Sequence, residues 1–352
     1  MAVSAEVQQN KPRKASENGA MSGTPLDRLH TLLNDDLAEV ERLLADRAAS
    51  PVATIPDMSG YLIDAGGKRL RPIVTLAAAK AASGDRTISD GGAAIKLAAA
   101  VEFIHTATLL HDDVVDDSDL RRGKAAAKNL WGASASILVG DFLFAKSFTL
   151  MVETESLKIL DILSTAATVI AEGEVRQLSV MGRTDVARDE YMAIVEAKTA
   201  ALFEAAARAG AIAAVGEGPT SDALGEYGRR LGRAFQLVDD ALDYGGATAV
   251  IGKSVGDDFR EGKLTLPVLV ARERASEEDK AFWERALDVS RQTEEDLPRA
   301  IALIRATGAV SATLKAAREE ATQAKKSLLG LSETAARDEL ALLADYCVDR
   351  AF

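Results

Sequence analysis

Apolar residues recur at every third or fourth position along most of the chain, and this spacing predicts amphipathic helices. The pattern begins at Leu26. Its longer periodic stretches cover residues 93–117, 141–152, 157–180, 189–215 and 222–244. No stretch keeps the strict alternation that is typical of a β-strand. We therefore expect an all-α protein, a bundle whose central helices surround a cavity.

Three segments depart from this helical pattern. Residues 1–25 are polar and almost free of large apolar side chains, which predicts a disordered tail ahead of a single domain over residues 26–352. The segment from Gly132 to Gly140 is either a turn or a helix interrupted by small residues. The glycine-rich segment 245–267 is expected to be a loop, and its length favours a functional one.

Composition and charge narrow the functional classes. The 352 residues are 47% hydrophobic and 27% charged, which is ordinary for a soluble globular protein. The net charge of −12 argues against nucleic acid as a partner, because no broad basic surface would face a phosphate backbone. A lone cysteine, Cys347, fits a reducing cytoplasm. We find no signal peptide and no uncharged apolar stretch of about eighteen residues, and so expect no membrane span.

Two acidic motifs of the form DDxxD each follow an apolar run. Their members are Asp112, Asp113 and Asp116, and then Asp239, Asp240 and Asp243. In a helix the first and last aspartates of such a motif share a face, so their charges repel unless a cation lies between them. One such motif is more often a solvated acidic surface. Two of them favour Mg²⁺, which binds carboxylate oxygens and completes its shell with water and phosphate.

Basic side chains at other points of the chain could bind the phosphates. The segment GGKRLRP contains Lys68 and Arg71 beside two glycines, and reads either as a solvated turn or as an anion site. Lys198 falls among apolar neighbours on a helix face, next to Thr199, which favours contact with an anion. Lys263, in the glycine-rich segment, is a candidate to close over a negatively charged ligand.

Further candidates lie close to the two motifs. His105 is two helical turns before the first motif and is either a core residue or a ligand. Gln236 precedes the second motif by three residues, and Lys253 lies in the same glycine-rich segment as Lys263.

Taken in order, these motifs resemble those of the trans-isoprenyl diphosphate synthases, or polyprenyl synthetases. The resemblance runs from Leu26 to the C-terminus. It includes GGKRLRP, LLHDDVVDDSDLRRG, the Lys198–Thr199 pair, FQLVDDALDY and GKSVGDDFREGK. It is strongest to the long-chain synthases that make the octaprenyl or decaprenyl side chain of ubiquinone. It implies the helical bundle of the isoprenoid synthases and a homodimer.

The resemblance also implies a role for each candidate. The six aspartates and Lys198 would be catalytic. Mg²⁺ would be held by Asp112, Asp116, Asp239 and Asp243. The allylic diphosphate, farnesyl or geranylgeranyl, would contact Arg121, Lys198, Thr199, Gln236 and Lys253. The diphosphate of isopentenyl diphosphate would contact Lys68, Arg71, His105 and Arg122, and Lys263 is a further substrate-binding candidate.

The length of the product should depend on the depth of an apolar tunnel. Ala107 and Thr108 lie about one turn before the first aspartates, where a bulky aromatic residue would close the tunnel. These small residues leave it open, and so we expect a long product. Its release suggests at most transient contact with a membrane.

Other readings remain open. A shorter-chain synthase of the geranylgeranyl type would use the same motifs. A class I terpene cyclase shares the fold but needs no pocket for isopentenyl diphosphate, and a non-catalytic subunit would be expected to lack one aspartate motif. A di-metal carboxylate bundle needs Glu-x-x-His pairs on facing helices, and the chain has only three histidines.

Overall fold

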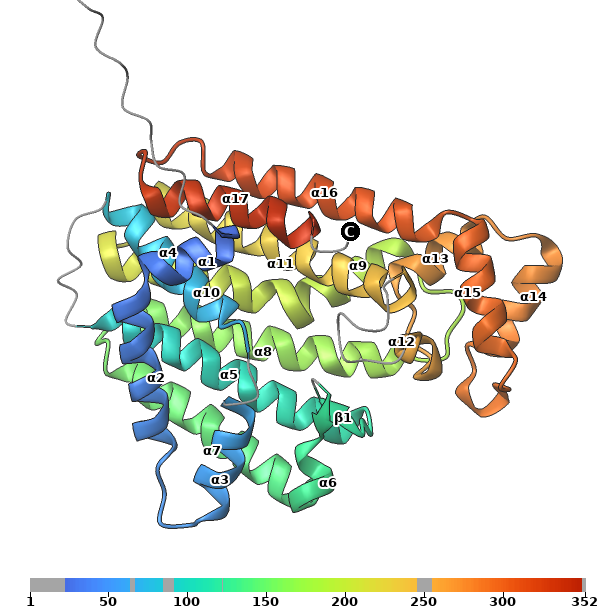
Figure 1. Ribbon diagram of the computed structural model, residues 1–352, viewed down its shortest axis with the longest axis horizontal. Coiled ribbons are helices and arrows are strands. Elements are labelled where there is room, and N and C mark those ends of the chain that lie inside the picture. Colours follow the sequence, from blue (N-terminus) through green and yellow to red (C-terminus); the bar gives the residue numbers. More distant parts are fainter. Residues whose placement is uncertain (1–22, 64–66, 85–91, 122, 246–254, 350–352) are drawn as a thin grey trace, which may run out of the picture.

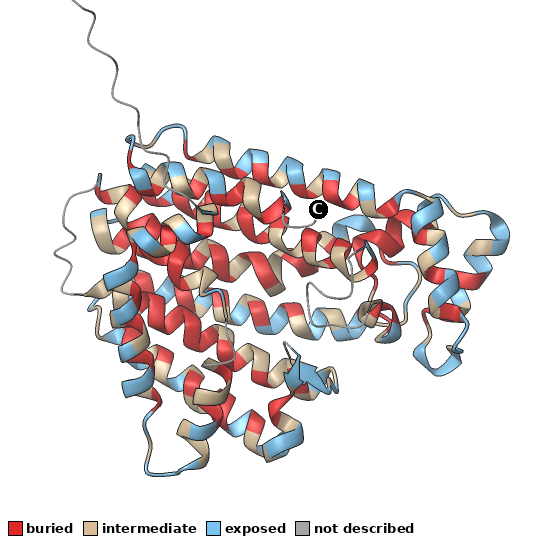
Figure 2. Cartoon of the chain, in the orientation of Figure 1, coloured by how far each residue is buried: buried red, intermediate tan, exposed pale blue. Residues whose placement is uncertain are grey.

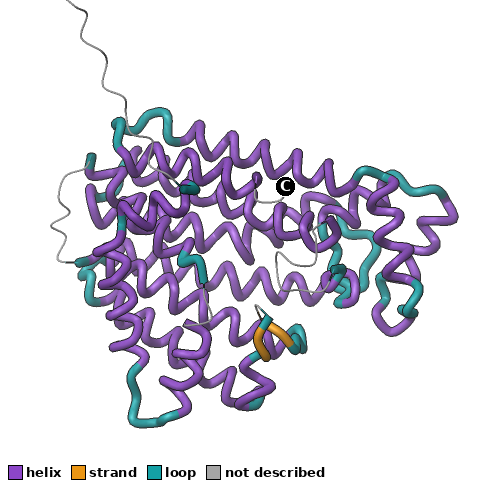
Figure 3. Tube along the Cα trace, in the orientation of Figure 1, coloured by secondary structure: helices purple, strands orange, loops and turns teal. Residues whose placement is uncertain are grey.

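The computed structural model describes residues 23–63, 67–84, 92–121, 123–245 and 255–349. Nearly all of these residues are helical, and the strands among them form one short hairpin (Figure 3). The prediction of an all-α fold is confirmed. The predicted N-terminal tail lies almost wholly outside the described residues; α1 begins at Pro25 and is capped by the Thr24 side chain, which accepts a hydrogen bond from the Asp27 amide.

Among the described residues up to Val180, the structure has eight α-helices and the hairpin. The helices are α1 (Pro25–Leu32), α2 (Asn34–Ala48), α3 (Thr54–Ile63), α4 (Leu70–Ser83), α5 (Ala93–Val115), α6 (Ala127–Trp131), α7 (Ala133–Val152) and α8 (Leu157–Val180). The antiparallel strands are β1 (Leu120–Arg121) and β2 (Lys124–Ala125), between α5 and α6.

The second half contains the other helices and two irregular turns. The α-helices are α9 (Arg188–Val195), α10 (Ala201–Val215), α11 (Pro219–Gly245), α12 (Asp257–Arg260), α13 (Leu266–Glu273), α14 (Glu277–Ala286), α15 (Asp296–Ala306), α16 (Ala309–Ser327) and α17 (Ala335–Asp349). A π-helical turn, η1 (Glu196–Ala200), joins α9 to α10, and a 3-10 turn, η2 (Val289–Arg291), follows α14.

The long helices lie side by side, with α14 and α15 at one end of the molecule (Figure 1). Helix α10 packs against α4 on one side and α11 on another, α11 packs against α16, and α5 packs against α4 and α7. Buried residues are concentrated on these inner helices (Figure 2). Gly210 of α10 allows a close contact with α4, because a Cβ atom there would lie 2.1 Å from the carbonyl oxygen of Thr75.

Several predicted boundaries are wrong in detail. The helix expected over residues 189–215 is divided by the π-turn, and the helix expected over 93–117 ends at Val115. The segment from Gly132 to Gly140, which the sequence left open, is helical after its first residue: Gly132 has φ +88° and precedes α7, which continues through Gly140. The predicted loop over 245–267 contains the short helix α12, and its residues 246–254 lie outside the described residues.

The sequence contains no uncharged apolar stretch of about eighteen residues, but two helices pass a test that admits up to two charged residues in such a window. Helices α5 and α7 are both long and apolar enough to cross a membrane by length and composition. In the bundle they pack against each other, with 67% of the apolar window of α5 buried but only 39% of that of α7. The pair α15 and α16 passes the same test only when taken together across a bend of 61°.

Candidate functional site

The two aspartate motifs lie at the C-terminal ends of α5 and α11. Asp112 is in the last turn of α5, and Asp116 caps that helix by donating its amide to the carbonyl oxygen of Asp112 (2.8 Å). The second motif occupies the last two turns of α11. A helix C-terminus already carries a partial negative charge, so carboxylates placed there increase the need for a cation.

The segment around α12 connects these helix ends. Lys263 donates a hydrogen bond to Asp116 (2.8 Å) and also pairs with Glu261 (2.6 Å). The amide of Asp258 donates to the carboxylate of Asp243 (3.3 Å), and the Lys263 amide donates to the Asp258 carbonyl (2.8 Å). The structure therefore brings the last aspartate of each predicted motif to the same short segment.

Burial changes the acidity of the first motif. Desolvation raises the pKa of Asp112 to about 6; the positive charge of Lys198 opposes this rise, whereas Glu174 and Asp116 add to it. Lys198 itself pairs with Glu174 of α8 at 2.9 Å. A carboxylate in this position favours a nearby cation, since a cation would offset both the desolvation and the repulsion.

Asp113 has a different environment from Asp112. Its side chain is completely buried and accepts hydrogen bonds from Nε (2.8 Å) and Nη2 of Arg121. Its second carboxylate oxygen has no hydrogen-bond partner. This ion pair fixes the β1–β2 hairpin to the end of α5. Arg121, predicted to contact a diphosphate, is thus held beside the first motif by Asp113.

The π-turn presents Lys198 and Thr199, and two glycines make room for it. A Cβ atom on Gly173 of α8 would lie 2.6 Å from the Cβ of Ala197, and one on Gly232 of α11 would lie 2.6 Å from the Cα of Ala200. The turn is therefore packed closely from both sides. π-turns often occur at functional sites, where the extra residue re-orients the side chains.

A buried chain of hydrogen bonds connects this turn to the second motif. Thr199 donates to the side-chain oxygen of Gln236 (2.6 Å), and Gln236 donates to Asp240 (2.8 Å). The hydroxyl of Tyr191, in α9, donates to the other oxygen of Asp240 (2.5 Å). Burial, reinforced by the charge of Asp258, raises the pKa of Asp240 to about 7.

Tyr191 and Glu174 were not found from the sequence. Tyr191 is 4% exposed and sits on a helix with an ordinary amphipathic pattern. Its partner Asp240 is 49 residues away, so no local spacing indicated the contact. Glu174 likewise lies 24 residues before Lys198. Both are recognised only when the helices are packed together.

Two of the residues predicted to bind the second diphosphate, Arg71 and His105, lie close together. Nη1 of Arg71 lies 3.2 Å from Nε2 of His105, and the guanidinium lies over the ring of Phe203, 4.6 Å from its centre. Lys68 is exposed just before α4. The predicted ligands Arg122 and Lys253 fall outside the described residues.

The two predicted chain-length residues lie on α5 between His105 and the first motif. Ala107 is buried, with 1% of its surface exposed. Thr108 is half-buried, and its hydroxyl donates to the carbonyl oxygen of His105 (2.8 Å).

The aspartates fit a hard divalent cation that shares its ligands with a substrate. In the part of the chain that the structure describes, no three His, Cys, Asp or Glu side chains are grouped closely enough to hold a metal ion. The donors are nevertheless carboxylate oxygens, and burial, with the charges of Glu174 and Asp116, raises the pKa of Asp112. Mg²⁺ typically takes only one or two protein carboxylates and fills its other positions with water and phosphate oxygens.

Comparison with known proteins shows similarity to one family over most of the chain. The family model described as polyprenyl synthetase matches residues 52–304. Octaprenyl diphosphate synthase of Escherichia coli K12 is 41% identical over 325 residues, which cover 92% of this chain and 99% of that protein. A polyprenyl synthase from Caulobacter crescentus, solved with calcium and isoprenyl diphosphate, is 52% identical with a TM-score of 0.87, covering 96% of this chain and 99% of that one. A decaprenyl diphosphate synthase from Rhodobacter capsulatus is 47% identical with a TM-score of 0.87, covering 93% and 100%.

The raised pKa of Asp112 predicts how stability changes with pH. Because the folded state binds this proton more tightly than the unfolded chain does, the stability from this group is complete below pH 4 and is lost as the pH rises through about 6. Asp112→Asn should therefore raise the free energy of unfolding at pH 8. We expect a gain of about 1–2 kcal/mol, which is less than the full pKa shift would give, because solvent screens part of the charge of this partly exposed side chain. It should also flatten the pH dependence between pH 4 and 7.

Urea denaturation in EDTA from pH 4 to pH 8 measures this effect. Asp161→Asn, which removes an equal charge from an exposed position on α8, is the matched control. A stability gain at pH 8 no larger than that of the control would contradict the burial of Asp112 as its cause.

Proposed function

The chain belongs to the polyprenyl synthetase family and is a prenyltransferase; from this premise we propose that it adds isopentenyl diphosphate units to an allylic diphosphate and makes a long trans-polyprenyl diphosphate. The observation that carries the proposal is that the segment 257–263 contacts both aspartate motifs, through Lys263 and the Asp258 amide, with the Arg71–His105 pair as a second anion site. Relatives named octaprenyl and decaprenyl diphosphate synthases support the long product.

The aspartates at the helix ends would hold the cation. Asp112 in α5 and its C-cap Asp116, with Asp239 and Asp243 of α11, would bind Mg²⁺ together with the allylic diphosphate. When bound, Mg²⁺ supplies positive charge that stabilises the departing diphosphate. The cation would offset the unfavourable charge of the Asp112 carboxylate, whose burial raises its pKa.

The two lysines of the site are held by carboxylates that a substrate could replace. Lys263 is paired with Asp116, and Lys198 with Glu174. When a diphosphate enters, both ammonium groups would turn to its oxygens and release those partners. They would then stabilise the negative charge that develops as the allylic C–O bond breaks and its electron pair moves to the diphosphate.

The second substrate would bind beside this site. Arg71 and His105 would hold the diphosphate of isopentenyl diphosphate, with its double bond directed at the allylic carbon. The electrons of that double bond form the new C–C bond. A proton then leaves the condensed product and is taken up by the released diphosphate. The product is again an allylic diphosphate, so another unit can be added.

The proposal also covers where the product is made and what it is used for. We propose that the enzyme works in the cytoplasm and makes the octaprenyl or decaprenyl chain of ubiquinone, starting from farnesyl or geranylgeranyl diphosphate. Release of so apolar a product would involve at most a transient membrane contact.

The direct test is to determine the product. The purified protein is incubated with Mg²⁺, farnesyl diphosphate and isopentenyl diphosphate, and the dephosphorylated products are measured by mass spectrometry. We expect a ladder that ends at one long prenyl alcohol and disappears in EDTA. A ladder that stops at geranylgeraniol would indicate the short-chain alternative. Unchanged farnesol or a cyclic hydrocarbon would refute chain elongation.

Product length tests the role of Ala107. Its replacement by phenylalanine should close the proposed tunnel one turn before the first aspartates and shorten the main product, while the first condensation continues. Because Ala107 is buried, the larger ring could also destabilise the helix. Thr108→Phe, at the half-buried neighbouring position, provides a second variant. A folded variant of either kind whose products keep their full length would contradict the tunnel model.

Apolar side chains on α7 and α8 support a homodimer. Of the fourteen large apolar side chains that are exposed among the described residues, six lie on these two helices: Ile137, Leu138, Val152, Leu157, Val175 and Leu178. The apolar window of α7 is only 39% buried within one chain. Monomeric proteins rarely expose extended apolar surface, and so we propose that these helices meet their counterparts in a second copy.

Introducing a charge on this surface tests the dimer. Leu138 is 67% exposed, and Leu138→Glu should lower the mass measured by sedimentation from that of a dimer to that of a monomer, because the interface would bury the new charge. Leu329→Glu is the control, since Leu329 is 80% exposed and follows α16. An unchanged dimer in Leu138→Glu would place the interface elsewhere.

A further inference from the structure

Arg69 has an unusual backbone conformation directly before α4. Its φ and ψ angles are +47° and +33°, and its carbonyl oxygen accepts the first hydrogen bond of the helix, from the Ile73 amide (2.9 Å). The residue that caps a helix N-terminus is normally extended, and the left-handed region disfavours a residue with a Cβ atom. Among the described residues other than glycine, only Asp117 and Glu155 share a positive φ. Other contacts must hold Arg69 in this state.

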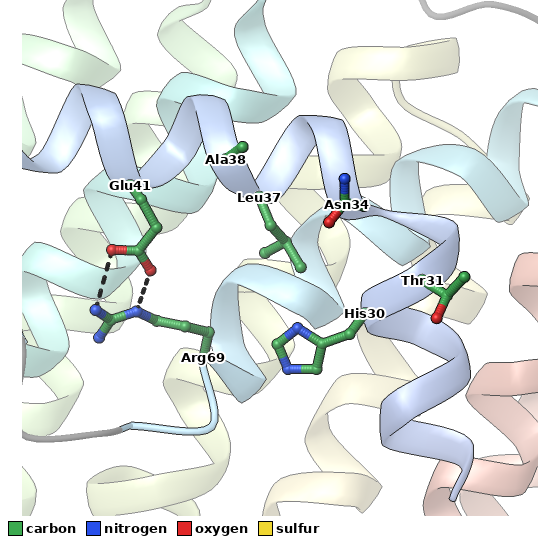
Figure 4. Close-up of a pocket in the computed structure, with 7 residues that line it drawn as sticks. All are labelled: His30, Thr31, Asn34, Leu37, Ala38, Glu41 and Arg69. Atoms are coloured by element: carbon green, nitrogen blue, oxygen red, sulfur yellow. Dashed lines mark hydrogen bonds and ion pairs between the residues drawn. The ribbon is translucent and has the colours of Figure 1, made fainter. Parts of the chain in front are cut away.

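Its side chain supplies those contacts. Nε and Nη2 donate to the two carboxylate oxygens of Glu41 (2.5 and 3.1 Å), Nη1 donates to Glu102 (2.9 Å), and Nη2 also donates to the carbonyl oxygen of Ile63 (2.8 Å). Figure 4 shows the paired bonds to Glu41, which reaches Arg69 from α2. The Arg69 side chain is 11% exposed and that of Glu102 only 7%. The guanidinium is therefore clamped between two helices.

The clamp borders a pocket formed with α1 and α2. Arg69 lines a pocket of about 340 Å³ whose other lining residues, His30 and Glu41 among them, all come from α1 and α2 (Figure 4). All three nitrogens of the guanidinium already donate hydrogen bonds to the protein, so it is not placed to bind a diphosphate. Its bonds instead fix the backbone of the segment that contains Arg69.

The clamped residue lies between the two cations of the anion site. Lys68 precedes it, and Arg71, which contacts His105, follows it by two residues. The direction in which these side chains point depends on the backbone angles at Arg69. Glu102 lies on α5 about one turn before His105. The Arg69–Glu102 ion pair therefore connects the left-handed turn to the helix that carries His105.

We propose that Arg69 is a positioning residue for isopentenyl diphosphate: its ion pairs with Glu41 and Glu102 hold the left-handed turn that directs Lys68 and Arg71 to the diphosphate. This inference rests on the proposed function, because it concerns the second substrate of that reaction. It predicts an effect on one substrate only, since the contacts of the allylic diphosphate lie on other elements.

Steady-state kinetics of Arg69→Met tests the proposal. We expect the KM for isopentenyl diphosphate to rise about tenfold or more, because a small displacement of positioned groups has large effects, while the KM for the allylic diphosphate stays within about twofold. Arg69→Lys, which can reach only one glutamate at a time, should recover part of the loss. Titration calorimetry of isopentenyl diphosphate without primer should show the same weakening, independently of turnover.

Arg28→Met is the matched control. Arg28 forms a similarly buried ion pair with Glu339 (2.7 Å), between α1 and α17, so its loss should lower the melting temperature without changing either KM. If Arg69→Met and Arg28→Met lower stability alike and leave the KM for isopentenyl diphosphate unchanged, the clamp is structural only and the proposal is wrong.

A milder variant covers the case in which Arg69→Met does not fold. Glu41→Gln removes one charge from the exposed side of the clamp, where the Glu41 side chain is 44% exposed. It should raise the same KM to a smaller extent, and an unchanged KM would also overturn the proposal. If the wild-type protein does not elongate the allylic primer at all, the proposed function itself is refuted. The two failures are therefore distinguishable.

Discussion

The concentration of negative charge at the ends of α5 and α11 is the constraint on which this structure depends. Several carboxylates share a partly buried region at helix termini that are themselves partially negative. The protein offsets this charge with its own cations: Lys263 beside Asp116, Arg121 beside Asp113, and Lys198 close to Asp112. Because the chain as a whole carries a charge of −12, an anionic ligand must be attracted by such local cations and not by the overall charge.

These ion pairs differ in how easily a ligand could displace one of the two partners. Asp113 is completely buried, so its bond to Arg121 is a fixed part of the framework. The side chains of Lys198 and Glu174 are each 23% exposed, and a ligand that brings its own negative charge could replace the glutamate at low cost. The bundle thus combines a rigid charge pair, which fixes the hairpin, with a more accessible pair beside the first aspartate motif.

The sequence allowed us to predict the helical fold and both aspartate motifs, because each signal is local: an apolar period, or carboxylates four residues apart on one face. From the sequence we could predict only that Arg71 and His105 bind the same ligand. Their direct contact could not be predicted, because 34 residues separate them. The partners of Lys198 and Asp240 could not be predicted, because they depend on how α8 and α9 pack. The π-turn was missed for a different reason: one extra residue leaves the apolar pattern on either side intact.

The π-turn has a consequence for how this site can vary during evolution. Each residue of an α-helix advances the chain by about 100°, and the extra residue in the turn therefore offsets the faces of α9 and α10 by that angle. Loss of any one residue there would leave two good helices, yet it would rotate Tyr191 away from Asp240 relative to Thr199. The geometry of the candidate site is in this respect set by the number of residues in a turn, so a one-residue deletion would be more damaging here than many substitutions.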